Sequence, residues 1–266
     1  MRIAFWNTHK NETINEIICD IIYEKGINII VLAEYNADSQ DLIQRLSLLN
    51  IEMEPYLTIG CDRIVMFGSI VDTKPGSQNK YFSTQIVDGK YILCGIHLPS
   101  KIYSNHQERR NIVIDTIIKD INELERKTGI EDTIILGDLN ENPYDPGCLE
   151  ATKFHGIPSG DDAVKNVRTV MNQQFKMFYN PMWNLFGDFN YPPGTYYYNS
   201  SDTNNSFWNI FDQVMIRPNL KDRFVEEGLE ILTETRNVSL VDKYKHPCKD
   251  ISDHLPIIFE IREGIL

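Results

Sequence analysis

Short apolar runs and longer amphipathic patterns alternate along the first half of the chain. The apolar runs at residues 3–6, 28–33 and 133–136 have the length of strands, and their continuity is typical of strands covered on both faces. Between the first two runs, isoleucines recur at helical spacing over residues 14–22, and Gly26 follows them as a helix terminator. The pattern therefore predicts a chain that begins strand–helix–strand.

Patterns of the same two kinds predict most of the remaining elements. Two strands, at residues 81–87 and 91–97, are expected to join through a turn at Asp88 and Gly89. The other predicted elements are helices at residues 41–49 and 105–127 and strands at 63–71, 211–216 and 257–261. Residues 143–209, rich in Pro, Gly, Asn and Tyr, show a looser pattern. Mixed strands with interspersed helices indicate an α/β fold.

Polar side chains stand at the ends of the predicted strands, where an α/β protein usually builds a site. One apolar strand ends in Gly137 and presents Asp138 and Asn140 two residues apart, on the same side of an extended chain. Asp212 lies within an apolar strand, where an unpaired carboxylate is costly, so a partner such as a histidine is expected. The other polar residues of this kind are Asn7, Glu34, His97, Asp253 and His254.

Each of these residues, taken alone, also has an ordinary structural explanation. Glu34 fits a charge that turns to solvent at a strand end, Asn7 fits a turn residue, and His97 fits a partly buried histidine with satisfied hydrogen bonds. Turn chemistry by itself accounts for Asp138 and Asn140. Their recurrence at successive strand ends is what favours a common active site.

Composition and charge narrow the class of protein. The 266 residues, 42% of them hydrophobic, suffice for a sizeable core, and the lack of a linker-like segment predicts one domain over residues 1–266. The formal charge of -12 argues against tight non-specific binding of duplex DNA, without excluding a nucleic-acid substrate. No apolar run approaches the roughly 20 residues that span a bilayer.

The cysteines and the start of the chain predict the compartment. The 5 cysteines are scattered and show no CxxC spacing, which favours free thiols in a reducing compartment over disulfides or zinc. The first predicted strand begins at Ile3, which leaves no room for a signal peptide. A cytoplasmic protein without a membrane segment is therefore expected.

Six short motifs, taken in order, carry a resemblance to a known family. They are Ala4-Phe5-Trp6-Asn7, Leu32-Ala33-Glu34, Gly95-Ile96-His97-Leu98-Pro99-Ser100, Gly137-Asp138-Leu139-Asn140, Phe211-Asp212-Gln213-Val214 and Ser252-Asp253-His254-Leu255-Pro256. Over essentially the whole chain, the sequence resembles the endonuclease/exonuclease/phosphatase superfamily, which includes deoxyribonuclease I, abasic-site endonucleases, inositol-polyphosphate phosphatases and neutral sphingomyelinases. The resemblance implies a four-layer α/β/β/α sandwich, two packed mixed sheets with helices outside, and metal-dependent hydrolysis of a phosphate ester.

The resemblance also implies a metal site. Glu34 is the first candidate ligand for Mg²⁺, with Asn7 assisting and Asp253 completing a second or shared metal position. Such a set suits Mg²⁺ because this ion prefers oxygen ligands and keeps several waters. Mn²⁺ is expected to substitute for it.

Catalytic roles follow from the same resemblance. Asp138 is expected to orient or deprotonate the attacking water, and Asn140 to donate to the phosphate. His254 would bind the phosphate or act as an acid–base group, with its orientation fixed by Asp212. His97 matches the position that donates to a phosphoryl oxygen in nucleases of the deoxyribonuclease I type. The residue that protonates the leaving group stays open.

Substrate-binding residues are predicted with alternatives beside them. Lys101 and Arg110 follow His97 closely and are candidates to contact a phosphodiester backbone, with a solvated helix face as the alternative. Thr195 lies in a loop that resembles one approaching the cleft in several family members. The aromatic residues of the segment 183–208 either stack bases or pack against the sheet edge.

The sequence lacks the signatures of the specialised branches of the superfamily. No inositol-phosphatase signature surrounds Asp138, and neither a membrane anchor nor a secretion signal is recognised, so the chain resembles a compact bacterial-type member. The leading hypothesis is a Mg²⁺-dependent phosphodiesterase, a nuclease, that acts by direct attack of an oriented water. The alternatives are a phosphomonoesterase on a small-molecule or lipid phosphate and a non-catalytic binding domain of the same fold.

Overall fold

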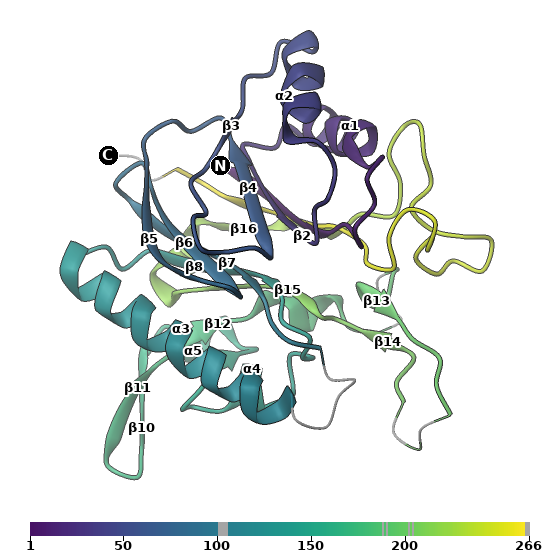
Figure 1. The fold of residues 1–266 in the computed structure, drawn as a ribbon. Coiled ribbons are helices and arrows are strands. Elements are labelled where there is room, and N and C mark those ends of the chain that lie inside the picture. The colour runs from purple at the N-terminus through teal and green to yellow at the C-terminus, as the bar shows by residue number, and fades with distance from the viewer. Residues whose placement is uncertain (101–105, 188, 190, 202, 204, 264–266) are drawn as a thin grey trace.

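Two mixed β-sheets pack face to face and helices cover their outer faces (Figure 1). The computed structural model describes residues 1–100, 106–187, 189, 191–201, 203 and 205–263. The first sheet has the order β16 (Phe224–Ile231), β17 (Ile257–Ile261), β1 (Arg2–Asn7), β2 (Ile29–Ala33), β4 (Ile64–Gly68) and β3 (Glu54–Pro55). The second has the order β5 (Thr73–Asn79), β6 (Phe82–Val87), β7 (Tyr91–His97), β8 (Thr133–Asp138), β15 (Asp212–Ile216), β12 (Phe178–Tyr179) and β9 (Gly156–Ile157).

The helices complete the layers. The helices α1 (Asn15–Lys25) and α2 (Ser39–Leu48) lie against the first sheet, and α3 (His106–Thr128) lies against the second (Figure 1). Helix α1 ends as predicted at Gly26, whose φ of 61° is left-handed and whose N–H donates to the carbonyl of Ile22. The predicted four-layer α/β/β/α sandwich is confirmed.

Successive side chains of β8 point to opposite faces of the sheet, and both faces are covered, which explains why its sequence is almost wholly apolar. Every residue of β8 is buried. Ile134 and Leu136 join the core between the two sheets, whereas Ile135 joins a second cluster with Ile117 and Ile121 of α3. A strand covered by a sheet on one face and a helix on the other needs apolar side chains at successive positions.

Most of the predicted strands are present, whereas the strands at the edges of both sheets, β3, β5, β9 and β16, were not predicted. The three-residue loop 88–90 between β6 and β7 has left-handed φ values at Asp88 and Gly89, and the backbone N–H of Lys90 donates to the carbonyl of Val87 at 3.0 Å, which closes a tight turn. Strand β4 is shorter than the predicted run 63–71. The unpredicted strands β5 and β16 lie at sheet edges, carry register irregularities and alternate little between apolar and polar residues.

The loosely patterned region 143–209 forms short elements that surround one end of the sheets. Besides β9 and β12, its elements are α4 (Pro146–Leu149), α5 (Gly160–Ala163), the hairpin of β10 (Val167–Val170) and β11 (Gln173–Lys176), the 3-10 helix η1 (Pro181–Leu185), and the hairpin of β13 (Tyr196–Tyr197) and β14 (Trp208–Asn209). A second 3-10 helix, η2 (Pro218–Arg223), precedes β16.

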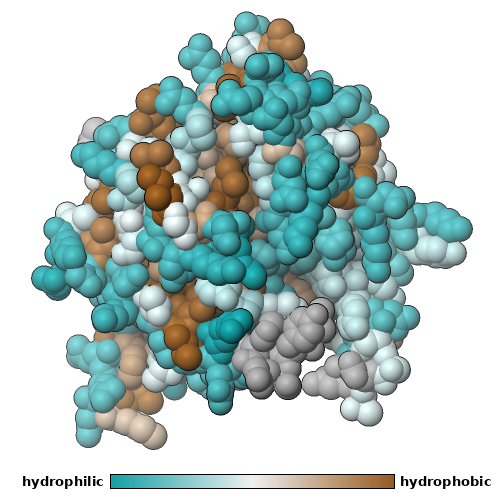
Figure 2. Space-filling model, viewed as in Figure 1, coloured by the Kyte–Doolittle hydropathy of each residue, from teal (hydrophilic) through white to brown (hydrophobic). Residues whose placement is uncertain are grey.

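The thiols, the helices and the surface of the molecule have the following features. The 5 cysteines all lie in the described part of the chain, and none of them forms a disulfide there. Within the described part of the chain, no helix has the length and apolar character needed to cross a bilayer. On the face shown in Figure 2, hydrophobic residues occur in small groups among hydrophilic ones.

Candidate active site

Strand pairing places three of the predicted site residues side by side in the second sheet. The parallel strands β7 and β8 pair His97 with Asp138, and the antiparallel strands β8 and β15 pair Asp138 with Asp212. In the first sheet, parallel pairing with β1 places Asn7 next to the end of β2, which Glu34 follows. Because β1 and β8 contact each other between the sheets, the two groups meet at one edge of the sandwich.

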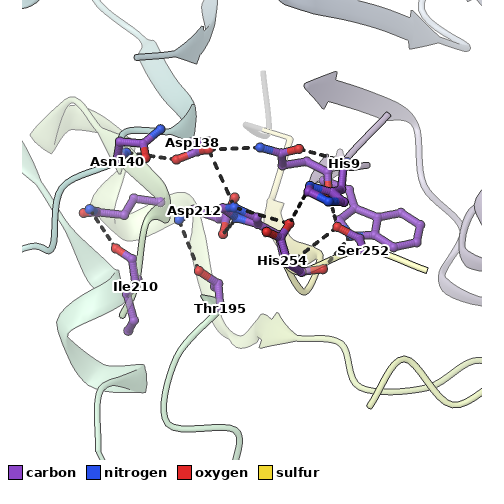
Figure 3. A network of polar contacts seen from close by, with 12 residues as sticks. His9, Asp138, Asn140, Thr195, Ile210, Asp212, Ser252 and His254 are labelled. Carbon is purple, nitrogen blue, oxygen red and sulfur yellow. Dashed lines mark hydrogen bonds and ion pairs between the residues drawn. The ribbon is translucent and has the colours of Figure 1, made fainter. Parts of the chain in front are cut away.

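Asp138 is the centre of the site, and its side chain is buried. Its Oδ2 accepts a hydrogen bond from Nδ2 of Asn7 at 3.0 Å, and its Oδ1 accepts one from the backbone N–H of Asn140 at 2.9 Å (Figure 3). The same Oδ2 lies 3.6 Å from Nε2 of His97 and 3.9 Å from Nε2 of His254. One carboxylate thus joins groups from both sheets.

His254 forms a hydrogen-bonded pair with Asp212. Nδ1 of His254 lies 2.8 Å from Oδ2 of Asp212, whose carboxylate is fully buried (Figure 3). The backbone N–H of Asp212 donates to the hydroxyl of Thr195 at 3.2 Å, and the backbone N–H of His254 donates to the hydroxyl of Ser252 at 3.1 Å. The indole N–H of Trp6 donates to the carbonyl of His254 at 2.9 Å. These contacts fix the imidazole in one orientation.

Burial and neighbouring charges shift the pKa values of three site residues. Burial, opposed by the charge of His254, raises the pKa of Asp138 to about 7. Burial alone would lower the pKa of His254, but the carboxylates of Asp212 and Asp138 outweigh it and raise that pKa to about 10. Burial lowers the pKa of His97 to about 3, so this imidazole is neutral at pH 7. A carboxyl group that exchanges a proton near neutrality therefore lies beside an imidazolium.

Oxygen atoms that suit a hard metal ion gather beside these groups. The carboxylate of Glu34 is partly exposed, and its Oε1 lies 3.7 Å from Nε2 of His97. Oδ1 of Asp253 lies 4.0 Å from Nε2 of His254 and 3.1 Å from Nδ1 of His9. The residues predicted to hold a metal are thus brought close to the predicted catalytic residues.

Asp138, Asp212 and His254 form the one group of potential metal ligands found among the described residues, with their ligand atoms within 4.8 Å of one another. Nδ1 of His254 is engaged by Asp212, and Oδ2 of Asp138 is engaged by Asn7. A carboxylate–imidazole pair beside a second carboxyl group explains this cluster better than direct metal binding does.

The residues predicted to bind substrate have other contacts, and Lys101 lies outside the described residues. Arg110 is a correction: its guanidinium is buried, with Nε 3.0 Å from Oε1 of Glu141, because the helix face that carries it packs inward rather than toward solvent. Thr195 is also fully buried and supports Asp212 through its hydroxyl. Asn140 donates one amide hydrogen to the carbonyl of Leu98 at 3.1 Å and has a second one left for a substrate.

Three further residues lie at the site: His9 and Glu141 were not singled out from the sequence, whereas Tyr196 was one of the aromatic residues expected to stack bases or pack against the sheet edge. His9 contacts Asp253 and donates its backbone N–H to Oδ1 of Asn7 at 3.0 Å. The ring of Tyr196 packs on that of His254, with 4.7 Å between their centroids. Glu141 directly follows Asn140, and this adjacency is the one signal in the sequence from which it could have been found.

Comparisons with known proteins identify the fold. No family model matches the sequence, and no curated protein sequence matches it significantly. An AP endonuclease from Archaeoglobus fulgidus is similar in structure, with a TM-score of 0.61 and 12% identity, covering 98% of this chain and 99% of its own. A 3' phosphatase, NExo, from Neisseria, solved bound to a product DNA hairpin, has a TM-score of 0.59 and 15% identity, covering 99% of this chain and 100% of its own.

A eukaryotic neighbour extends the comparison. The human Nocturnin catalytic domain, solved with a bound sulfate anion, has a TM-score of 0.56 and 13% identity, covering 98% of this chain and 93% of its own. These alignments run along nearly the whole of each chain, so the likeness concerns the complete sandwich. The chain therefore has a deoxyribonuclease I-like fold.

Proposed function

We propose that this chain is a metal-dependent phosphoester hydrolase, and specifically a Mg²⁺-dependent phosphodiesterase that acts on nucleic acid. The proposal is carried by the convergence of Asp138 with the Asp212–His254 pair and with the oxygen donors of Glu34 and Asp253. The fold that the chain shares with an AP endonuclease and with a phosphatase solved on a DNA product supports a nucleic-acid substrate.

The charges and donor atoms of the site fit a hard divalent cation. Carboxylates outnumber the single imidazolium of His254, and His97, being neutral, offsets none of the negative charge. Glu34, Asn7 and Asp253 would hold Mg²⁺ through oxygen atoms, and Mn²⁺ would take its place. When bound, the cation supplies charge neutralisation at the phosphoryl oxygens.

The chain's own residues then share the work of hydrolysis. Asp138 accepts the proton of the attacking water, for which a pKa of about 7 is well matched to neutral pH. His254 donates from Nε2 to a phosphoryl oxygen, since Asp212 engages its Nδ1. His97 and Asn140 donate their remaining N–H groups to the same phosphoryl group, where charge develops.

Metal-dependent turnover is the test of this function. The purified chain should hydrolyse single-stranded DNA, RNA or bis(4-nitrophenyl) phosphate in the presence of Mg²⁺ or Mn²⁺, and EDTA should abolish the activity. Asp138→Asn should lower kcat by about 10²–10⁴-fold, because it removes the proton acceptor. Absence of metal-dependent hydrolysis over a broad panel of phosphate esters would contradict the proposal.

A phosphomonoesterase on a small or lipid phosphate is the second candidate, favoured by the formal charge of -12. A strongly acidic protein repels a long polyanion, whereas one phosphate group is neutralised by the metal site alone. Rates on oligonucleotides compared with rates on sugar, inositol and nucleotide phosphates separate the two functions.

A further inference from the structure

A cavity of about 420 Å³ adjoins the proposed active site, and Asp253 is the one lining residue that the mechanism above uses among those described. Its walls come from the end of β13 with the residues that follow it, and from the loop of residues 242–250. Asp253 also lines the cavity, and its Oδ1 lies 4.0 Å from Nε2 of His254. Anything bound in the cavity is therefore a neighbour of the reacting phosphate.

The cavity has a rigid aromatic wall. The ring of His246 stacks on that of Tyr197, with 3.6 Å between centroids and 9° between planes. Trp208 packs its edge against Tyr197 at 5.4 Å, which fixes the stack from the β14 side. The loop that carries His246 is itself held in shape by Asp242, whose Oδ1 accepts the backbone N–H groups of Tyr244 and His246. A preformed wall of this kind binds a flat ring at low entropic cost.

Tyr198 provides a free aromatic surface in the same cavity. Its side chain is about half exposed, at 48%. Tyr196 lies between it and the catalytic imidazole, with 6.4 Å to the Tyr198 ring and 4.7 Å to the His254 ring. A planar group stacked on Tyr198 thus lies one aromatic residue away from His254.

Charge limits what the cavity accepts. Lys249 is the one lysine or arginine among the described residues that line it, whereas Asp242, Asp250 and Asp253 contribute three carboxylates. A strand that continued through the cavity would bring several phosphates against these carboxylates. A single ring with N–H groups fits instead, because carboxylates and the Asn199 amide offer acceptors for it.

We propose that this cavity binds the nucleobase of one terminal nucleotide, whose phosphate is the one hydrolysed at Asp138. The inference rests on the proposed function and narrows its substrate to a nucleotide or the end of a nucleic-acid strand, rather than an internal position. Aromatic stacking on Tyr198 supplies affinity without selecting one base, since every base has a π-face.

The binding test uses the metal-free protein in EDTA, so that no turnover occurs. Tryptophan fluorescence is followed as adenosine 5'-monophosphate or ribose 5-phosphate is added. The nucleotide should bind about tenfold more tightly than the sugar phosphate, because only the nucleotide has a base to stack. Equal affinities of the two compounds would overturn the proposal.

Substitutions of Tyr198 test whether the tighter binding of the nucleotide arises in this cavity. Tyr198→Ala should lower the affinity for adenosine monophosphate about tenfold and leave that for ribose 5-phosphate unchanged, while Tyr198→Phe should keep both. Tyr23→Ala is the matched control, because Tyr23 is a similarly exposed tyrosine on α1, 54% exposed, and does not line the cavity. Wild-type affinity in Tyr198→Ala would contradict the assignment.

Turnover separates this inference from the proposed function. With Mg²⁺, Tyr198→Ala should raise KM for a single-stranded oligonucleotide that ends in adenosine and not for one that ends in an abasic residue, tested at each end in turn. A linear oligonucleotide should compete with the oligonucleotide substrate better than a closed circle of the same sequence does. Equal competition by the two would overturn the preference for a terminal nucleotide. No hydrolysis of any phosphate ester, with base-dependent binding intact, would refute the hydrolase and leave the base site standing.

Discussion

The guanidinium of Arg110 and the carboxylate of Glu141 form an ion pair directly behind the turn that carries Asp138 and Asn140. Nε lies 3.0 Å from Oε1, and the two side chains are only 1% and 2% exposed. Arg110 also donates to the carbonyl of Pro99 at 3.4 Å, so the pair ties the segment after β7 to the segment after β8. Arg110, which was expected to contact substrate, therefore holds the segments that carry the proposed site residues.

Breaking this pair should impair both stability and catalysis. Glu141→Gln leaves the buried charge of Arg110 without its counter-charge, which should lower the free energy of unfolding by about 3 kcal/mol. The turn that positions Asp138 and Asn140 loosens as well, so kcat should fall by about 10²-fold. Urea denaturation and steady-state kinetics measure the two effects.

A second buried pair offers a matched control. Nε of Arg217 lies 2.7 Å from Oε1 of Glu125, with side chains 3% and 2% exposed. Among the described residues, the polar partners of this pair are Asn122, Thr133, Lys176 and Met177, which lie outside the proposed site. Glu125→Gln should cost a similar free energy of unfolding and leave kcat unchanged. Equal losses of kcat in the two variants would show that Glu141 acts through stability alone.

Asp212→Asn should lower kcat by about 10²–10³-fold with little effect on KM. The amide removes the negative charge that keeps His254 protonated and favours the wrong imidazole tautomer. NMR of the imidazole nitrogens should show a lower His254 pKa than in the wild type. A variant with normal kcat would remove His254 from the mechanism.

Mg²⁺ should stabilise the folded chain if Glu34 helps to hold it. At about 100 times its Kd, the ion should add about 2.7 kcal/mol to the free energy of unfolding and raise Tm by about 5–10 °C. Glu34→Gln should abolish the shift, whereas Glu16→Gln, an exposed glutamate on α1, should retain it. An unchanged shift in Glu34→Gln would exclude this carboxylate as a ligand.

Low pH should weaken the ion pair between Glu125 and Arg217. Burial raises the pKa of Glu125, but the charge of Arg217 and hydrogen bonds from Arg217, Lys176 and Thr133 outweigh it, and the pKa falls below its usual 4.5. A carboxyl group whose pKa is lower in the folded state than in the unfolded state stabilises the folded chain at pH values above its unfolded-state pKa. This contribution is lost as the pH falls through the folded-state pKa. The stability gap between wild type and Glu125→Gln should therefore narrow below about pH 4.5, as urea midpoints at pH 7, 5 and 3 will measure.

The central strands were predictable because their surroundings leave few choices. Strand β8 needs apolar residues on both faces, and Gly137 is required because a Cβ there would lie 1.9 Å from the carbonyl oxygen of Ile96. Edge strand β5 was not predicted because none of its 7 positions is buried, so all of them tolerate polar residues. The burial of Arg110 was not predicted because its counter-charge comes from Glu141, which lies outside helix α3.

The pairing of His97, Asp138 and Asp212 on three neighbouring strands has a consequence for folding. Asn7 and Asp138 are 131 residues apart in sequence, and β1, at the centre of its sheet, pairs with β17 near the C-terminal end. Contacts of such long range are completed late, once the costs of loop closure have been met. The proposed site takes Asn7, Glu34 and His97 from the first half of the chain and Asp138, Asp212, Asp253 and His254 from the second. A nascent or cleaved half therefore lacks part of the proposed centre, and we expect no hydrolysis before the sandwich closes.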